Sequence, residues 1–350
     1  MRIALLGPAW FPVPPQGYGG IEAIVSLLAD GLVGAGHEVT LFASGDSRSR
    51  AEVQAVFPEA PSSRIGTTDA ELLHALTCFE RAGEFDVVSD HSGPLAAALG
   101  GAAATPVVHT VHGPLDGEAG EIYRKAATTN PRLALVSLSE NQRRPAPELP
   151  WAGTCHNAIE LSDYPVKTEA GDYLLFLGRL SPDKGAHRAA EVAREAGLPL
   201  RLAGKCREPA EEAYFAECVE PLLGGDIEWL GEATLDEKVC LLQGARATLF
   251  PIEWEEPFGL VMIESMACGT PVIATRRGAV PEVVPDGVGG VVVDDYREMV
   301  RALDELDRID PAACRAWVEE RFSPARMVSC YEEIFESVVA GQTDAVAATA

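Results

Sequence analysis

Apolar segments of strand length alternate with amphipathic segments of helical length along most of the chain. Residues 2–6 form an apolar run, residues 21–33 carry apolar side chains at helical spacing, and residues 38–43 form a second apolar run. A strand followed by a helix and another strand predicts a β-α-β unit, and repeated units of this kind predict a parallel sheet. Further apolar runs, each followed by polar residues, lie at 85–88, 106–110 and 133–138.

The same alternation starts again after a polar segment at residues 162–171. Residues 173–177 form a continuous apolar run, residues 186–196 have a helical composition that Gly197 ends, and residues 200–203 are typical of the next strand. A chain of 350 residues with 47% hydrophobic content exceeds a single typical core. The sequence therefore predicts an α/β protein with two doubly wound parallel-sheet domains, residues 1–165 and 166–323.

Two carboxylates stand eight positions apart around a Pro-Phe-Gly turn, at Glu256 and Glu264. The residue before a proline is pushed away from helical angles, so Glu256 is predicted to lie in an extended loop and a helix to start near Phe258. The first amides of that helix, at Phe258, Gly259 and Leu260, would lie at the positive end of its dipole, where a phosphate is stabilised.

Glu264 lies on the border of the apolar face of the same predicted helix. A carboxylate held against apolar neighbours is costly unless hydroxyl groups or a cation satisfy it, and sugar hydroxyls are suitable partners. The alternative is that Glu264 is a solvated or salt-bridged helix residue and Glu256 an ordinary loop acid.

Two cations follow the predicted strand at 173–177. Arg179 comes directly after it, and Lys184 lies five residues later. Ligands of open parallel sheets bind beyond the carboxyl ends of the strands, so both cations are predicted to reach a ligand crevice. They are informative because the chain has 28 basic against 53 acidic residues and a formal charge of −25. The alternative is that both are surface charges paired with neighbours such as Asp183.

Glycines stand just before the predicted helix at 21–33, where they let backbone amides approach an anion. They are Gly17, Gly19 and Gly20. Their spacing is not the Gly-x-Gly-x-x-Gly of dinucleotide-binding enzymes, so a hydride-transferring function loses its main support.

His112 lies just past the apolar run at 106–110, on the expected ligand side of the sheet. A histidine at such a place either binds a ligand or makes a structural hydrogen bond, and the residue pattern leaves both open. His109 is out of phase with it along the chain and is expected to face the other way.

Together these segments resemble a known family. Gly-Arg-Leu-x-x-x-Lys-Gly, followed some seventy residues later by Glu-Pro-Phe-Gly-x-x-x-x-Glu-x-x-Ala-x-Gly-x-Pro-Val-Ile-Ala, is similar to the family-4 group of retaining, nucleotide-sugar-dependent glycosyltransferases with the GT-B fold. The resemblance implies two Rossmann-like domains that face a deep cleft. It also implies that a terminal helix, residues 324–341, crosses back to the N-terminal domain.

The resemblance implies a role for each candidate residue. Arg179 and Lys184 would bind the donor's diphosphate, Glu256 would hold hydroxyls of the transferred sugar, and Glu264 would hold the ribose. His112 would contact the donor sugar and completes the catalytic candidates, which are His112, Arg179, Lys184 and Glu256. The expected donor-binding residues are Gly19, Gly20, Arg179, Lys184, Glu256, Phe258, Gly259, Leu260 and Glu264.

The implied reaction transfers a sugar from a nucleoside-diphosphate sugar to a hydroxyl of a small-molecule or glycan acceptor, with retention of configuration. It would need no metal and no cofactor besides the donor itself. Two other functions stay open: an epimerase or phosphorylase with the GT-B fold, and a nucleotide-sugar-binding protein without turnover. The residues do not specify the donor's base or sugar, the acceptor, or the oligomeric state.

Charge and cysteine content narrow the remaining classes. The acidic balance argues against binding nucleic acid or an anionic bilayer through bulk charge. The eight cysteines show no paired metal spacing, so no zinc site or disulfide is expected. No run approaches the roughly 18 consecutive apolar residues of a membrane span, and the first residues lack a signal-peptide pattern. We therefore expect a cytoplasmic protein without membrane association.

Overall fold

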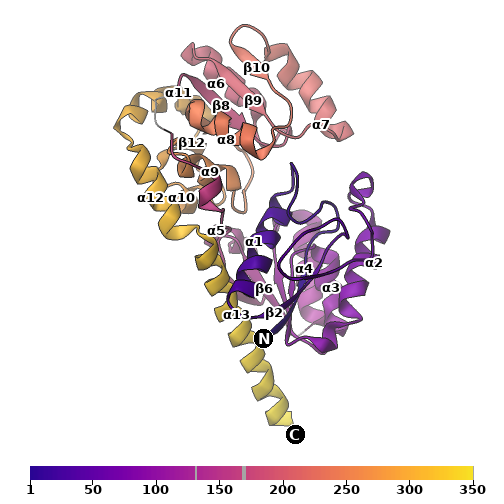
Figure 1. The fold of residues 1–350 in the computed structure, drawn as a ribbon. Helices are drawn as coiled ribbons and strands as arrows, with labels where there is room; N and C mark the ends of the chain where they lie inside the picture. The colour runs from indigo at the N-terminus through magenta and orange to yellow at the C-terminus, as the bar shows by residue number, and fades with distance from the viewer. Residues whose placement is uncertain (131, 168–170, 350) are drawn as a thin grey trace. The chain divides into compact units, whose positions relative to one another are not determined.

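The computed structural model describes residues 1–130, 132–167 and 171–349 and divides them into two compact units. Unit 1 is Met1–Ala158 together with the chain from Pro324 onward, and unit 2 is Ile159–Ser323. Each unit is a parallel sheet covered by helices (Figure 1). The predicted α/β class with two Rossmann-like parallel sheets is confirmed.

In its described residues, unit 1 has a seven-stranded sheet with the order β3-β2-β1-β4-β5-β6-β7, and neighbouring strands are parallel. The strands are β1 (Arg2–Leu6), β2 (Glu38–Phe42), β3 (Glu52–Gln54), β4 (Val87–Asp90), β5 (Val107–Thr110), β6 (Leu133–Ser137) and β7 (Trp151–Thr154). The helices are α1 (Gly20–Gly34), α2 (Thr68–Phe79), α3 (Pro94–Leu99), α4 (Gly117–Thr129), α5 (Glu140–Arg143) and α13 (Pro324–Thr349).

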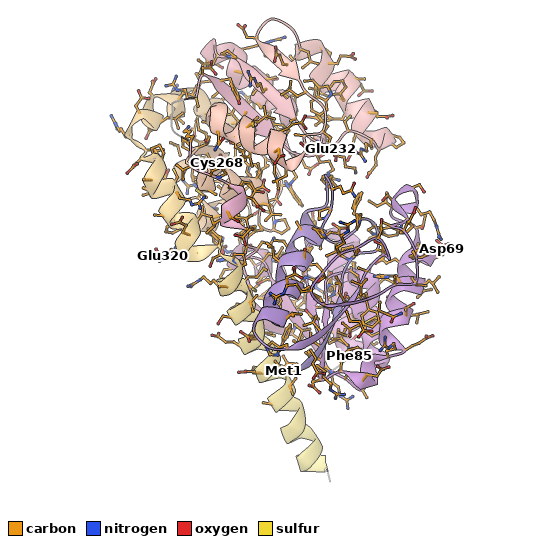
Figure 2. The ribbon with its side chains drawn as sticks, viewed as in Figure 1. Met1, Asp69, Phe85, Glu232, Cys268 and Glu320 are labelled. Atoms are coloured by element: carbon orange, nitrogen blue, oxygen red, sulfur yellow. The ribbon has the colours of Figure 1, made fainter. Side chains whose placement is uncertain are left out.

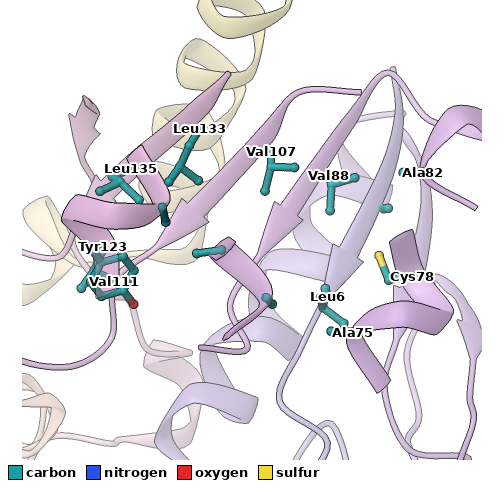
Figure 3. Packing of buried hydrophobic residues seen from close by; sticks show 14 of the residues in the cluster. Leu6, Ala75, Cys78, Ala82, Val88, Val107, Val111, Tyr123, Leu133 and Leu135 are labelled. Carbon is teal, nitrogen blue, oxygen red and sulfur yellow. The ribbon is translucent and has the colours of Figure 1, made fainter. Parts of the chain in front are cut away.

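A core of apolar side chains fills the space between this sheet and its helices. Leu6, Val88 and Leu135 from the strands meet Ala75 and Tyr123 from α2 and α4 (Figure 3). All five are at most 3% exposed. Strands buried on both faces read as continuous apolar runs, which explains why the sequence pattern located these strands so directly.

Helix α13 belongs to unit 1 although it lies at the other end of the chain. It packs against α1 and β7, and Figure 1 shows it alongside α1. The hydroxyl of Tyr331 on α13 lies 2.9 Å from that of Thr110 at the end of β5, and both residues are 1% exposed. The terminal helix is therefore part of the core of the first unit.

In its described residues, unit 2 has a six-stranded parallel sheet with the order β10-β9-β8-β11-β12-β13. The strands are β8 (Tyr173–Leu177), β9 (Leu200–Ala203), β10 (Ile227–Trp229), β11 (Ala245–Phe250), β12 (Val272–Thr275) and β13 (Gly290–Val293). The helices are α6 (Ala186–Ala196), α7 (Pro209–Tyr214), α8 (Leu235–Gly244), α9 (Leu260–Ala267), α10 (Val280–Val283), α11 (Met299–Ala302) and α12 (Pro311–Arg321).

Two elements differ from the sequence prediction. The strand expected at 85–88 runs from Val87 to Asp90, because the Asp90 carboxylate is satisfied by His109 on β5 and by the hydroxyl of Ser92, which follows β4. The helix expected from Phe258 begins at Leu260. Gly259 has a φ of 84°, a left-handed conformation that interrupts the helical path set by Pro257.

The segment between the two sheets belongs to unit 2 from Ile159 onward, although residues 159–165 were assigned to the first domain from sequence. The amide of Ile159 donates to the carbonyl of Phe322, and the Arg315 guanidinium bonds to the carbonyl of Leu161. These bonds tie the segment to α12 and the residue that follows it. Residues 168–170 of the predicted boundary segment lie outside the described residues.

Candidate functional site

The unit 2 sheet reverses its strand order between the neighbouring strands β8 and β11. The chain continues from β8 toward β9 on one side of this point and from β11 toward β12 on the other. Ligands of doubly wound sheets bind at the carboxyl ends of the strands at such a point. Arg179 and Lys184 follow β8, and Glu256 follows β11. Three of the four catalytic candidates thus emerge from the switch point of one sheet.

Lys184 and Glu256 are in direct contact. The Lys184 ammonium donates to Oε2 of Glu256, which lies 72 residues further along the chain. Their side chains are 18% and 9% exposed, so the pair is largely shielded from water. The ammonium also lies 4.6 Å from the centroid of the Trp254 ring, close enough for a cation–π interaction.

The two loops that carry this pair are joined by their backbones as well. The amide of Glu253 donates to the carbonyl of Asp183 at 3.1 Å. The Glu256 carbonyl accepts from the amide of Ala279 at 2.8 Å, which connects it to the loop after β12. The position of the Glu256 carboxylate is therefore set by both the β8 and the β12 loops.

Arg179 differs from Lys184 in its surroundings. Its guanidinium lies 3.6 Å from the Asp183 carboxylate, and 36% of its side chain is exposed. Arg179 is therefore a partly exposed charge paired with Asp183, as the alternative interpretation proposed. For Lys184 that alternative is wrong, because its partner is the remote Glu256.

Glu264 on α9 is 8% exposed and is salt-bridged to Lys238, as the alternative interpretation predicted, and a hydroxyl group satisfies it as well. The Tyr164 hydroxyl donates to its Oε1 at 2.9 Å, and the Lys238 ammonium donates to the same oxygen at 2.5 Å. Burial and the neighbouring carboxylate raise the pKa of Tyr164, so the phenol stays protonated and donates. Among the described residues, no side chain or amide hydrogen-bonds to Oε2.

The predicted anion site at Phe258–Leu260 has a different geometry from a simple helix start. Only Leu260 lies within α9, and Phe258 and Gly259 form the turn before it. The Phe258 ring is 1% exposed and packs edge-on against Phe322 with ring centroids 5.6 Å apart. The turn is therefore anchored by its apolar side chain, beside the loop that carries Glu256.

In unit 1, Gly19 and Gly20 stand at the start of α1, with Gly19 as its N-terminal cap and Gly20 as its first residue. Glu22 lies in the first turn of the same helix and is 4% exposed, and burial raises its pKa to about 7. The start of α1 therefore carries a carboxyl group that can exist in the neutral form near neutral pH.

His112 follows β5 and is partly exposed. Its Nε2 lies 2.9 Å from Nδ1 of His91, which follows β4. Burial first, and the neighbouring His109 second, lower the pKa of His112 to about 3. His109 has different neighbours, Asp90 at 2.6 Å and Tyr123 at 2.9 Å, in agreement with its expected opposite orientation.

The sequence analysis did not identify the partners of Glu264. Lys238 and Tyr164 come from α8 and the segment before β8, and nothing in their local pattern links them to Glu264. Trp254 lies only two residues before Glu256 in the sequence, so a contact between its ring and the partner of Glu256, Lys184, could have been expected. Figure 2 shows the side chains of both units, with Cys268 labelled at the end of α9.

Two doubly wound parallel sheets, one in each unit, are the architecture of the GT-B fold. A model described as "Glycosyl transferases group 1" matches residues 160–319, and one described as "Glycosyltransferase Family 4" matches residues 18–165. The two models together match residues 18–319, and the chain belongs to glycosyltransferase family 4.

Among curated relatives, D-inositol 3-phosphate glycosyltransferase of Frankia alni is 29% identical over 65% of this chain and 66% of its own. The chain thus spans slightly less than two thirds of that relative. The enzyme of the same name from Pseudarthrobacter chlorophenolicus is 26% identical over 90% of this chain and 91% of its own. Among solved structures, AviGT4, a glycosyltransferase involved in avilamycin A biosynthesis, is 27% identical. It has a TM-score of 0.72 and covers 97% of this chain and 98% of its own.

Within residues 1–130, 132–167 and 171–349, no helix is both long and apolar enough to cross a membrane. No three histidine, cysteine, aspartate or glutamate side chains gather there as metal ligands would.

Proposed function

We propose that this enzyme transfers a sugar from a nucleoside-diphosphate sugar to a hydroxyl of its acceptor, with retention of the anomeric configuration. The observation that carries the proposal is the contact between Lys184 and Glu256 at the switch point of unit 2. It places a shielded cation beside a carboxylate where a ligand of this sheet is expected, and a diphosphate and a sugar need these two groups.

The two carboxylates share one arrangement. Glu256 has its Oε2 engaged by Lys184, and Glu264 has its Oε1 engaged by Lys238. In the described part of the chain, the second oxygen of each carboxylate has no hydrogen-bond donor. An ionised carboxylate accepts through both oxygens, so each is left to bind hydroxyl groups. We assign Glu256 to the transferred sugar and Glu264 to the ribose of the donor.

The chemistry follows from the charges. The bond between the anomeric carbon and the phosphate oxygen breaks, the acceptor oxygen forms the new bond, and the acceptor proton passes to the leaving diphosphate. Negative charge develops on that diphosphate, and fixed cations stabilise it more in the transition state than in the ground state. Lys184 is held for this task by Glu256 and Trp254, and Arg179 supplies a second, more exposed cation.

Metal independence is part of the proposal, because the two cations would supply the charge that a divalent ion supplies elsewhere. Its test is transfer in the presence of excess chelator, with unchanged kcat expected. Loss of transfer that added magnesium restores would contradict this part while leaving the sugar transfer itself in place.

The donor is best found by thermal-shift screening of the full chain against uridine, guanosine, adenosine and thymidine diphosphate sugars, since a ligand that binds the native state raises the melting temperature. The donor that raises the melting temperature is then incubated with an acceptor panel that includes inositol phosphates, because the two relatives from Frankia alni and Pseudarthrobacter chlorophenolicus are D-inositol 3-phosphate glycosyltransferases. We expect release of the nucleoside diphosphate and a product that keeps the donor's anomeric configuration by NMR.

Other outcomes discriminate against the proposal. Conversion of the nucleotide sugar without an acceptor identifies an epimerase, and phosphate acting in place of a hydroxyl acceptor identifies a phosphorylase. A thermal shift with no nucleotide release over the whole acceptor panel identifies a binding protein without turnover.

A further inference from the structure

His112 is held at its backbone and at its side chain. The Gln142 side-chain amide donates to the carbonyls of Val111 and Gly113, both at 2.8 Å, and so clamps the chain on either side. The imidazole is held by His91, whose Nδ1 lies 2.9 Å from Nε2 of His112. The ring orientation of His112 is therefore built into unit 1.

His91 is held just as firmly. It is 1% exposed, its Nε2 lies 3.2 Å from the Ser89 hydroxyl, and its ring centroid lies 5.6 Å from that of Tyr331 on α13. It follows β4, which meets β1 where the strand order of the unit 1 sheet reverses. Ser89, His91 and His112 thus form one hydrogen-bonded chain at the switch point of this sheet.

The protons in this chain can be arranged in two ways. Burial lowers the pKa of both His91 and His112, so each ring is neutral and carries one proton. In the first arrangement Ser89 donates to His91, His91 donates from Nδ1 to His112, and His112 keeps its own proton on Nδ1. In the second arrangement both bonds are reversed, and His112 keeps its proton on Nε2.

The buried hydroxyl of Ser89 decides between them. Ser89 is 0% exposed, and among the described residues its oxygen has His91 as its sole side-chain partner. In the second arrangement Ser89 accepts from His91, and its own proton is left without an acceptor. An unmet buried donor costs its full desolvation penalty, so the first arrangement is favoured.

We infer that Ser89 and His91 are positioning residues that hold His112 as the Nδ1–H tautomer, so that His112 donates a hydrogen bond to an oxygen of the donor sugar. This inference rests on the proposed function and on the role that the family resemblance implies for His112, which is contact with the donor sugar. The inference also predicts specificity. A sugar that lacks the contacted oxygen should bind less well, because the Nδ1–H group of His112 is then left without an acceptor.

The tautomer is tested directly on the full chain without any substrate. Histidines are labelled with ¹⁵N, the signals of His112 are assigned by comparison with His112→Gln, and the ring nitrogens are read by long-range proton–nitrogen correlation. We expect the Nδ1–H pattern in the wild type. The Nε2–H pattern would overturn the inference whatever the enzyme transfers.

Variants of His91 separate positioning from packing. In His91→Asn the side-chain amide nitrogen occupies the place of Nδ1 and still donates to His112, whereas His91→Phe keeps a ring but no donor. We expect His91→Asn to retain the tautomer and most of kcat/KM for the donor. We expect His91→Phe to mix the tautomers and to lower kcat/KM by roughly tenfold.

A packing role gives different results. It predicts that His91→Phe leaves the tautomer of His112 unchanged, or that His91→Asn is as impaired as His91→Phe, and either result overturns the inference. Melting temperatures of both variants show that they are folded. If no donor is turned over at all, the proposed function fails, while the tautomer measurement still decides the state of His112.

Discussion

Breaking the contact between Lys184 and Glu256 should destabilise unit 2 and abolish donor binding. Lys184→Met removes the charge and keeps an unbranched apolar stem over Trp254, and it leaves the carboxylate of Glu256, 9% exposed, without its cation. Removing one partner of a buried ion pair costs about 3–5 kcal/mol. Because the Lys184 side chain is 18% exposed, we take the cost to be about 2–3 kcal/mol.

That loss is measurable by differential scanning calorimetry of the full chain. For a unit the size of Ile159–Ser323, each kcal/mol moves the melting temperature by about 2–4 °C, so the transition of unit 2 should fall by about 4–12 °C. The double variant Lys184→Met/Glu256→Gln leaves no unpaired charge, and we expect it to recover most of the loss. Both variants should lose the stabilisation by donor, about 2.7 kcal/mol at a hundredfold excess over Kd.

Glu256 follows the carboxyl end of β11, and a residue at the amino end of β11 provides the control. Arg246 lies at the amino end of β11, 3.8 Å from Asp307, whose side chain is 87% exposed. Arg246→Met should therefore change neither the melting temperature nor the donor shift by a measurable amount. A Lys184→Met protein that melts like the wild type and still responds to donor would refute both the pairing and the assignment of the site.

Three further predictions concern Glu22, Gly278 and His112. The pKa of Glu22 is raised from 4.5 to about 7, so the folded state holds this proton more tightly than the unfolded state does. The stability that the neutral carboxyl group contributes is fully present below pH 4.5 and is lost as the pH rises through 7, a loss of roughly 3 kcal/mol. Glu22→Gln should shrink the fall in melting temperature between pH 5 and pH 8, and an equal fall in both proteins would contradict this. A Cβ at Gly278 would lie 2.2 Å from the amide nitrogen of Glu256, so Gly278→Ala should abolish donor binding. Gly287→Ala, at a similar φ with open space around it, should cost stability alone; equal donor affinity in the two variants would count against the role of Glu256. The ring signals of His112 should not titrate between pH 5 and pH 8, because its pKa is lowered to about 3, and a midpoint near 6.5 in an NMR titration would show that the ring is solvated.

The parts of the fold that could be predicted from sequence are those whose cause is local. The strand at 173–177 and the helix at 186–196 have the predicted bounds, because a buried parallel strand is apolar throughout and Gly197 ends the helix in a left-handed conformation. The start of α9 was placed two residues early, since Pro257 is compatible with a helical turn and only the φ of Gly259 shows that the chain turns first.

The candidate site shows the same division. The pattern of residues located Lys184, Glu256 and Glu264, because each lies at a place where strand ends or helix faces give a sequence signal. Their partners Lys238 and Tyr164 carry no such signal, since the contacts arise when separate elements pack around α9. The same holds for His91, whose importance depends on the neighbour that the sheet order brings beside it.

Under the proposed function, the lysine partners of Glu256 and Glu264 allow a strongly acidic chain to bind an anionic donor. A carboxylate beside the diphosphate would repel it, and the cost grows as water is excluded. In unit 2 each of the two carboxylates is paired with a lysine through one oxygen, so its charge is offset before the donor arrives. The second oxygen keeps its capacity to accept from hydroxyl groups. Replacing Lys238 with methionine therefore removes more than an ion pair: it leaves Glu264 as an unbalanced charge and should weaken binding of the nucleoside diphosphate itself, even without the sugar.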